Sequence, residues 1–166
     1  MSIRQVRQRC ERLLKDVSVP DPFDAETFRD VVANRRGRPI RMIPREQMAG
    51  PCGVLVSMTH TDYVFFDSAT SPVHRDHIVA HELGHLLCDH VPRQRVGEDL
   101  IRTLMPDLDP AMVRRVLART TYDDVDELEA EIVASLVLAP RRGQRPDGTG
   151  NAVIDRLQRS LGATGA

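Results

Sequence analysis

The chain has 166 residues, 41% hydrophobic and 28% charged, which fits one globular domain and excludes wholesale disorder. Its 23 basic and 24 acidic side chains leave a formal net charge of −1. That balance excludes the broad basic surface of a dedicated nucleic-acid binder, so we expect no direct contact with nucleic acid.

The cysteines and the apolar segments indicate the cellular compartment of the protein. Cys10, Cys52 and Cys88 are too few and too scattered for a disulfide framework, and reduced thiols fit a reducing cytosol. The charged N-terminal segment lacks the apolar core of a signal peptide. The longest apolar stretch, residues 132–139, is far shorter than the ~20 residues that span a bilayer. We therefore expect a cytoplasmic protein with no membrane contact.

Two helices are expected within residues 1–38. Apolar residues at helical spacing over 2–17 predict the first helix. Asp24 is a suitable cap for the second, and Gly37 is a suitable stop. A small sheet is expected within 39–68. Its strands are predicted at 39–43, 53–58 and 62–67, the last being rich in aromatic and β-branched residues.

Helices are expected again after the sheet. Ser71 followed by Pro72 is typical of a helix start, and this helix is expected to span 72–91. The later segments are expected to be a loop over 92–108, helices within 109–139, and a linker with a short terminal helix or tail over 141–166. This order predicts a single α+β domain over residues 1–140.

The segment His81-Glu82-Leu83-Gly84-His85 carries the most informative chemistry. Residues four apart share a helix face, about 6 Å from each other, so both imidazoles can reach one metal ion at the ~2.0–2.1 Å that zinc prefers. Glu82 points about 100° away and can reach a water at the metal without being a ligand. This is the geometry of the HExxH metallopeptidase motif, with Glu82 as general base. Ordinary histidines on an amphipathic helix are the weaker interpretation.

A hydrolytic zinc site also needs a third protein ligand. The candidates form an acidic run of Asp123, Asp124, Asp126, Glu127, Glu129 and Glu131. Most of these carboxylates are expected to be solvated near a helix N-terminus. Ala130 and Ala134 continue the face of Glu127, so this helix could lie close to the zinc helix. Glu131 shares that face, and spacing alone does not choose between Glu127 and Glu131. Gly84 likewise suggests close approach of another backbone.

The segments HIVAHELGHLL and ELEAEIVASLVLAP together resemble the ImmA/IrrE family of zinc metallopeptidases. That family pairs an HExxH helix with a later helix that carries an E-x-E-A pattern, apolar residues and a proline. Aligning the second segment on Pro140 assigns the third-ligand position to Glu127. The resemblance covers about residues 40–140. The chain departs from the family pattern at Glu131, where asparagine is frequent, and in the long interval between His85 and Glu127.

The resemblance implies a zincin-like α+β fold, with a small sheet packed on a central HExxH helix and further helices on both sides. It implies one Zn²⁺ per chain, held by His81, His85 and Glu127. The implied activity is that of a zinc endopeptidase that cleaves a separate helix-turn-helix transcriptional repressor, in transcription regulation or a stress response. A toxin-like protease of a two-gene pair would use the same chemistry. The alternative is a zinc-holding interaction or stress-sensing module without turnover, which would not need Glu82.

The remaining parts of such a site are less determined by the sequence. The developing oxyanion needs a hydrogen-bond donor, for which Tyr122 is preferred over His74 and His60. An extended substrate segment is expected to add to a sheet edge, at 54–58 or 63–66.

Four other features receive structural interpretations. Cys88 is about 10 Å along the helix from His81, too far to share its metal, and is expected to be a small buried residue. His77 and Asp89 could contact the ligands, but surface positions are favoured. The arginine-rich segments 35–45 and 141–145 are expected to be solvated.

Overall fold

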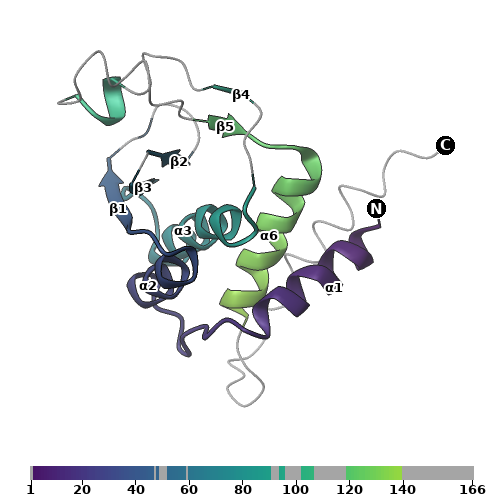
Figure 1. Ribbon diagram of the computed structural model, residues 1–166. Coiled ribbons are helices and arrows are strands. Elements are labelled where there is room, and N and C mark those ends of the chain that lie inside the picture. Colours follow the sequence, from purple (N-terminus) through teal and green to yellow (C-terminus); the bar gives the residue numbers. More distant parts are fainter. Residues whose placement is uncertain are drawn as a thin grey trace.

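The computed structural model describes residues 2–46, 48, 52–58, 60–90, 94–95, 102–106 and 119–139. The helix expected after residue 109 and the linker and tail expected over 141–166 lie outside these residues. The described part is an α+β fold with a three-stranded sheet, as the sequence predicts. Figure 1 shows the sheet on one side of a central helix and two other helices on the opposite side.

The two N-terminal helices form as expected from their ends. α1 (Ile3–Leu14) begins with a capping box at Ser2 and ends three residues before the apolar pattern does. α2 (Ala25–Arg36) begins at Asp24, whose carboxylate accepts a hydrogen bond from the Thr27 N–H at 2.7 Å. It ends at Gly37, which has a φ of 66°, a conformation that glycine adopts without steric cost.

The three expected strands are β1 (Ile40–Arg45), β2 (Gly53–Ser57) and β3 (Asp62–Asp67). Their order is β1-β3-β2, with β1 parallel and β2 antiparallel to β3. Because β3 is paired on both sides, the expectation that residues 63–66 could offer a free edge is wrong. Within the described residues β2 pairs with β3 alone, so β2 remains the candidate edge.

Both faces of the sheet are buried. On one face Leu55, Val64 and Phe66 join the main core between the sheet and the helices. On the other face, side chains of β2 and β3 pack with Leu104 from the described segment 102–106. The sheet is therefore held rigidly between two apolar clusters, which fixes the position of β2.

The central helix is α3 (Pro72–Leu87), which Ser71 caps with its hydroxyl. The sheet and α2 pack on one side of α3, and α6 (Asp124–Leu138) packs on the other. α1 packs against α6, on the side of that helix away from the sheet (Figure 1). This arrangement agrees with the expected small sheet on a central helix with helices on both sides.

α3 and α6 approach each other closely at Gly84. A Cβ at this position would lie 3.2 Å from the Ala130 carbonyl oxygen and 3.3 Å from the Ala130 Cα. The expected close approach of another backbone at Gly84 is confirmed. The small side chains of Ala130 and Ala134 are fully buried in the same contact.

A second, two-stranded sheet was not expected. β4 (Gln94–Arg95) pairs antiparallel with β5 (Arg119–Thr121), although 92–108 is expected to be a loop. Such short strands have no sequence periodicity, because they are held by pairing with a distant segment. β5 leads directly into Tyr122 and α6. Among the described helices, none is both long and apolar enough to cross a membrane.

Two arginines of the segment 35–45, Arg36 and Arg38, are partly buried in ion pairs, contrary to the expectation that the segment is solvated. Asp62 is fully buried, and its Oδ2 lies 3.2 Å from Arg36 Nε and 3.4 Å from Arg38 Nε. Arg36 also donates a hydrogen bond to the Leu86 carbonyl oxygen at 2.7 Å, which ties α2 to the end of α3. Asp89 is exposed and its carboxylate pairs with Arg36, which fits the surface position favoured for it.

Candidate metal centre

Three donor atoms from α3 and α6 meet at one point. His81 Nε2 and His85 Nε2 are 3.1 Å apart, and Glu127 Oε2 lies 3.3 Å from the first and 3.8 Å from the second. A tetrahedral ion with bonds of ~2.0–2.1 Å spaces its ligand atoms ~3.3 Å apart. The three side chains therefore fit around one metal ion, as the sequence predicts for these residues.

The structure distinguishes the two candidate glutamates. Glu131 Oε2 lies 3.5 Å from His81 Nδ1, the ring nitrogen that faces away from the other ligands. The same oxygen is 3.0 Å from His77 Nε2. Glu131 is therefore a hydrogen-bond partner of a candidate ligand, whereas Glu127 joins the donor group itself. His77, for which a surface position was favoured, is only one-third exposed and supports Glu131.

Glu82 is buried beside this group, with 8% of its surface exposed. Burial raises its pKa to about 7, and the charge of Glu127 acts in the same direction, while His81 opposes the shift. A Cβ on Gly53 would lie 2.5 Å from Glu82 Oε1, so the glycine of β2 provides the space that this carboxylate occupies. The sequence predicted Gly53 only as the start of a strand, because its contact with Glu82 joins two distant elements.

The pKa values of the two histidines are shifted in opposite directions. His85 has 1% of its surface exposed, and burial, with His81 and His90 nearby, lowers its pKa to about 3. Burial also acts to lower the pKa of His81, but the hydrogen bond to Glu131 and neighbouring carboxylates outweigh it and raise that pKa. At neutral pH His85 is neutral, as metal binding requires, and His81 is where protons compete with a metal.

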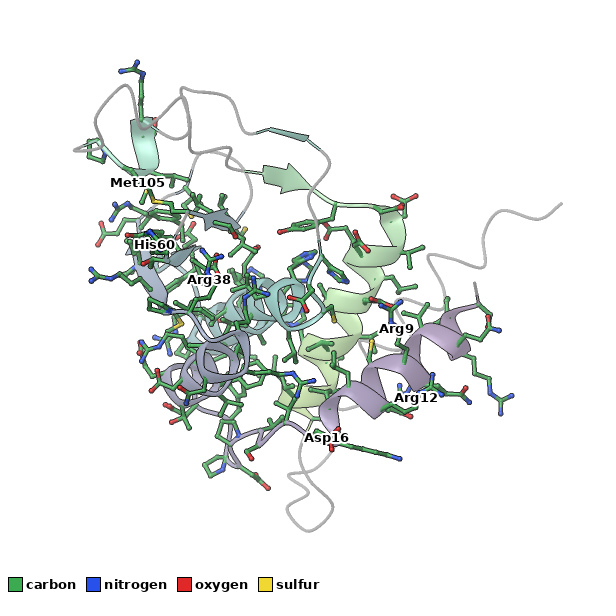
Figure 2. The ribbon with its side chains drawn as sticks, in the orientation of Figure 1. Arg9, Arg12, Asp16, Arg38, His60 and Met105 are labelled. Carbon is green, nitrogen blue, oxygen red and sulfur yellow. The ribbon has the colours of Figure 1, made fainter. Side chains whose placement is uncertain are left out.

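Tyr122 also lies at this site. Its ring stacks on His85, with ring centroids 3.6 Å apart and an interplanar angle of 14°. The proposed role of Tyr122 as an oxyanion donor stays a prediction. His60 and His74 are exposed and neither lines the pocket, so the structure does not bring these two candidates to the centre. Figure 2 shows His60 on the sheet side of the molecule.

A pocket of about 250 Å³ opens onto the three donor atoms. Its walls come from β2, from the face of α3 that carries Glu82, and from Tyr122 and Glu127. Residues 52–55 form the wall opposite α3. An extended chain bound along β2 would therefore pass directly over the candidate metal centre.

Behind the centre lies a second group of polar side chains, Cys88, His90 and Glu129. Cys88 is thus separate from the His81 group, as expected. Glu129 is 2% exposed, so the expectation that it is a solvated carboxylate is wrong. It faces α1, where Arg9 Nη1 lies 3.2 Å from its Oε1. The helix was expected to continue to residue 91, but α3 ends at Leu87, so that expected end is wrong. His90 therefore lies beyond the helix, where helical spacing gives no signal.

No protein-family model matches this chain, and a search of curated proteins found no match. The likeness of its two motifs to the ImmA/IrrE pattern therefore stays a prediction, and the geometry of the site has to carry the functional argument.

Proposed function

We propose that this protein is a zinc-dependent endopeptidase of zincin-like fold. The observation that carries the proposal is the convergence of His81 Nε2, His85 Nε2 and Glu127 Oε2 beside the buried Glu82. Two imidazoles and one carboxylate, with a position left for water or substrate, are a common ligand set of hydrolytic zinc. A zinc ion bound there supplies a Lewis acid that polarises a carbonyl and lowers the pKa of water.

Glu82 is the proposed general base. It lines the pocket next to the ligands, and its pKa of about 7 makes it a carboxylate at slightly alkaline pH and a competent acid once protonated. It would accept a proton from the attacking water and pass it to the leaving amine. Tyr122, which lines the same pocket, is the proposed donor to the developing oxyanion.

The proposed substrate is a segment of protein bound in extended form. β2 borders the pocket, and its pairing within the described residues leaves one edge toward which such a segment could add. That the substrate is a helix-turn-helix repressor in the cytoplasm follows from the motif resemblance alone. The site geometry supports cleavage of an extended chain, whatever protein that chain belongs to.

The test is a digest analysed by mass spectrometry. The zinc-loaded protein is incubated with the helix-turn-helix regulator encoded beside it and, separately, with a peptide library. Wild type is expected to give discrete fragments, and Glu82→Gln none while keeping zinc. Glu26→Gln, an exposed glutamate on α2, is the matched control and should cleave like wild type.

Two outcomes would contradict the proposal. Identical fragments from wild type and Glu82→Gln would indicate a contaminating protease. A zinc-loaded wild type that cleaves neither substrate but binds the regulator tightly would favour the non-catalytic interaction module.

A further inference from the structure

A continuous chain of polar contacts leads from the candidate metal centre to α1. His85 Nδ1 lies 3.0 Å from His90 Nδ1, and His90 Nε2 lies 3.0 Å from Glu129 Oε2. The other oxygen of Glu129 faces Arg9, whose side chain Figure 2 shows between α1 and α6. Both His90 and Glu129 have side chains at most 4% exposed, so water does not compete for these contacts.

Only one arrangement of protons satisfies every contact in this chain when both rings are neutral. The Glu129 carboxylate can only accept, so His90 must donate from Nε2. His90 Nδ1 then carries a lone pair and accepts a hydrogen bond from His85 Nδ1–H. The lone pair of His85 is left on Nε2, the atom that faces His81 and Glu127.

We propose that His90 and Glu129 are positioning residues that hold His85 in the tautomer with a free Nε2 lone pair, with Arg9 holding Glu129. This inference rests on the proposed metal site and extends it, because a ligand histidine binds metal best when its second nitrogen has a fixed partner. Here the partner is another histidine rather than a carboxylate. The backbone bond from the His90 N–H to the His85 carbonyl oxygen, at 3.0 Å, keeps the two residues together.

A second metal ion at Cys88, His90 and Glu129 is the competing explanation for the same cluster. It is disfavoured because both ring nitrogens of His90 and the Oε2 of Glu129 already have partners, and Oε1, which accepts no hydrogen bond from a described residue, faces the Arg9 guanidinium. A dication there would also lie next to the Arg9 guanidinium, 3.2 Å from Glu129. The two explanations differ in metal stoichiometry, which is one per chain for the positioning role and two for a second site.

The first experiment detects the tautomer directly in the metal-free protein. Long-range ¹H–¹⁵N correlation spectra distinguish protonated from unprotonated ring nitrogens, and the His85 signals are assigned by their loss in His85→Ala. We expect His85 protonated at Nδ1 and His90 protonated at Nε2. In His90→Ala, His85 should become a mixture of tautomers. A wild-type His85 protonated at Nε2 would overturn the proposal, whatever the enzyme does.

The second experiment measures zinc affinity by competition with a chelating indicator. His90→Ala is expected to weaken binding about 10–100-fold. His90→Asn keeps an acceptor near His85 and should recover part of that loss. His90→Gln, closer to histidine in size, places its amide toward Glu129 and should recover less. A packing role alone would give the opposite order, with glutamine better than asparagine, and would overturn the proposal.

Controls separate this inference from the proposed function. Asp126→Asn is the matched control, because Asp126 Oδ1 is 3.8 Å from His90 Nε2, beyond hydrogen-bond distance, and it should bind zinc like wild type. Glu129→Gln should weaken zinc binding without unfolding the protein, which circular dichroism would check.

A wild type that binds no zinc contradicts the proposed function. A wild type that binds one zinc, with His90→Ala equal to it, contradicts only the positioning role, and two zinc ions per chain would replace it with the second site.

Discussion

The two candidate imidazole ligands are one helical turn apart, yet their surroundings are opposite. His81 is 22% exposed, and its Nδ1 faces Glu131, which is shared with the partly exposed His77. His85 is almost fully buried, with Tyr122 stacked on its ring and His90 behind it. One half of the site thus meets solvent and the pocket, while the other is anchored in the core. The difference shows how one helix can offer a metal both access and a fixed geometry.

Removing either imidazole tests this difference most strongly. His81→Ala and His85→Ala should both abolish zinc retention, measured by elemental analysis. Unfolding of the metal-free proteins in urea should separate them. His85→Ala leaves a cavity under Tyr122 and a buried His90 Nδ1 without its partner, and should lose about 2–4 kcal/mol of unfolding free energy. His81→Ala should lose less than about 1 kcal/mol. Equal losses of unfolding free energy in the two variants would contradict the difference between the surroundings of His81 and His85.

A substitution on β2 should displace Glu82 in the pocket without affecting the buried surroundings of His85. In Gly53→Ala the new methyl group would meet Glu82 Oε1 and displace the proposed base. We expect turnover to fall about 100-fold, since small misplacements of a catalytic group have effects of that size. Zinc content should stay at one per chain. Val54→Ala on the same strand is a control for strand packing, and an equal loss of turnover there would remove the special role of Gly53.

The pH dependence of zinc binding should follow His81 rather than His85. The raised pKa of His81 means that its protonated form competes with zinc as the pH falls through that value, so affinity is lost on the acid side. His85, with a pKa of about 3, remains neutral over the same range. Glu131→Gln removes a carboxylate charge that helps to raise the pKa of His81, so the loss of affinity should move to lower pH. Titrations between about pH 5 and 8 would show this, and an unchanged midpoint would contradict it.

The smallest expected effect is a difference in the alkylation rates of the three thiols. These rates report how accessible the surroundings of His81 and of His85 are to a reagent. Burial raises the pKa of Cys10 to about 11 and that of Cys88 to about 12, so both should resist alkylation. Cys52 is exposed at the pocket wall and should react first. We expect one rapidly modified thiol per folded chain, identified by peptide mapping, with zinc content unchanged. Rapid labelling of Cys88 would show that the core half opens readily.

The sequence predicted those parts of the site that depend on local geometry. Two features are properties of single helices and could be read from the sequence: the i, i+4 spacing of His81 and His85, and the small-residue face after Glu127. Helical spacing could not choose between Glu127 and Glu131, because that choice depends on how α6 crosses α3. His90 and Gly53 gave no signal either, since one follows a helix end and the other acts on a distant element. The same limit applies to β3, whose central position results from pairing between distant segments.

The ion pair of Arg9 with Glu129 has a thermodynamic consequence for the N-terminal helix. α1 also contacts α6 through the Cys10 thiol, which donates to the Glu129 carbonyl oxygen at 3.8 Å. With the proposed positioning role of Glu129, the docking of α1 and metal binding at the candidate centre would be linked equilibria. Reciprocity requires that any factor by which docked α1 tightens metal binding is the factor by which bound metal tightens the docking of α1. A partner that pulled α1 away would then act on the centre from the opposite side of α6, without entering the pocket.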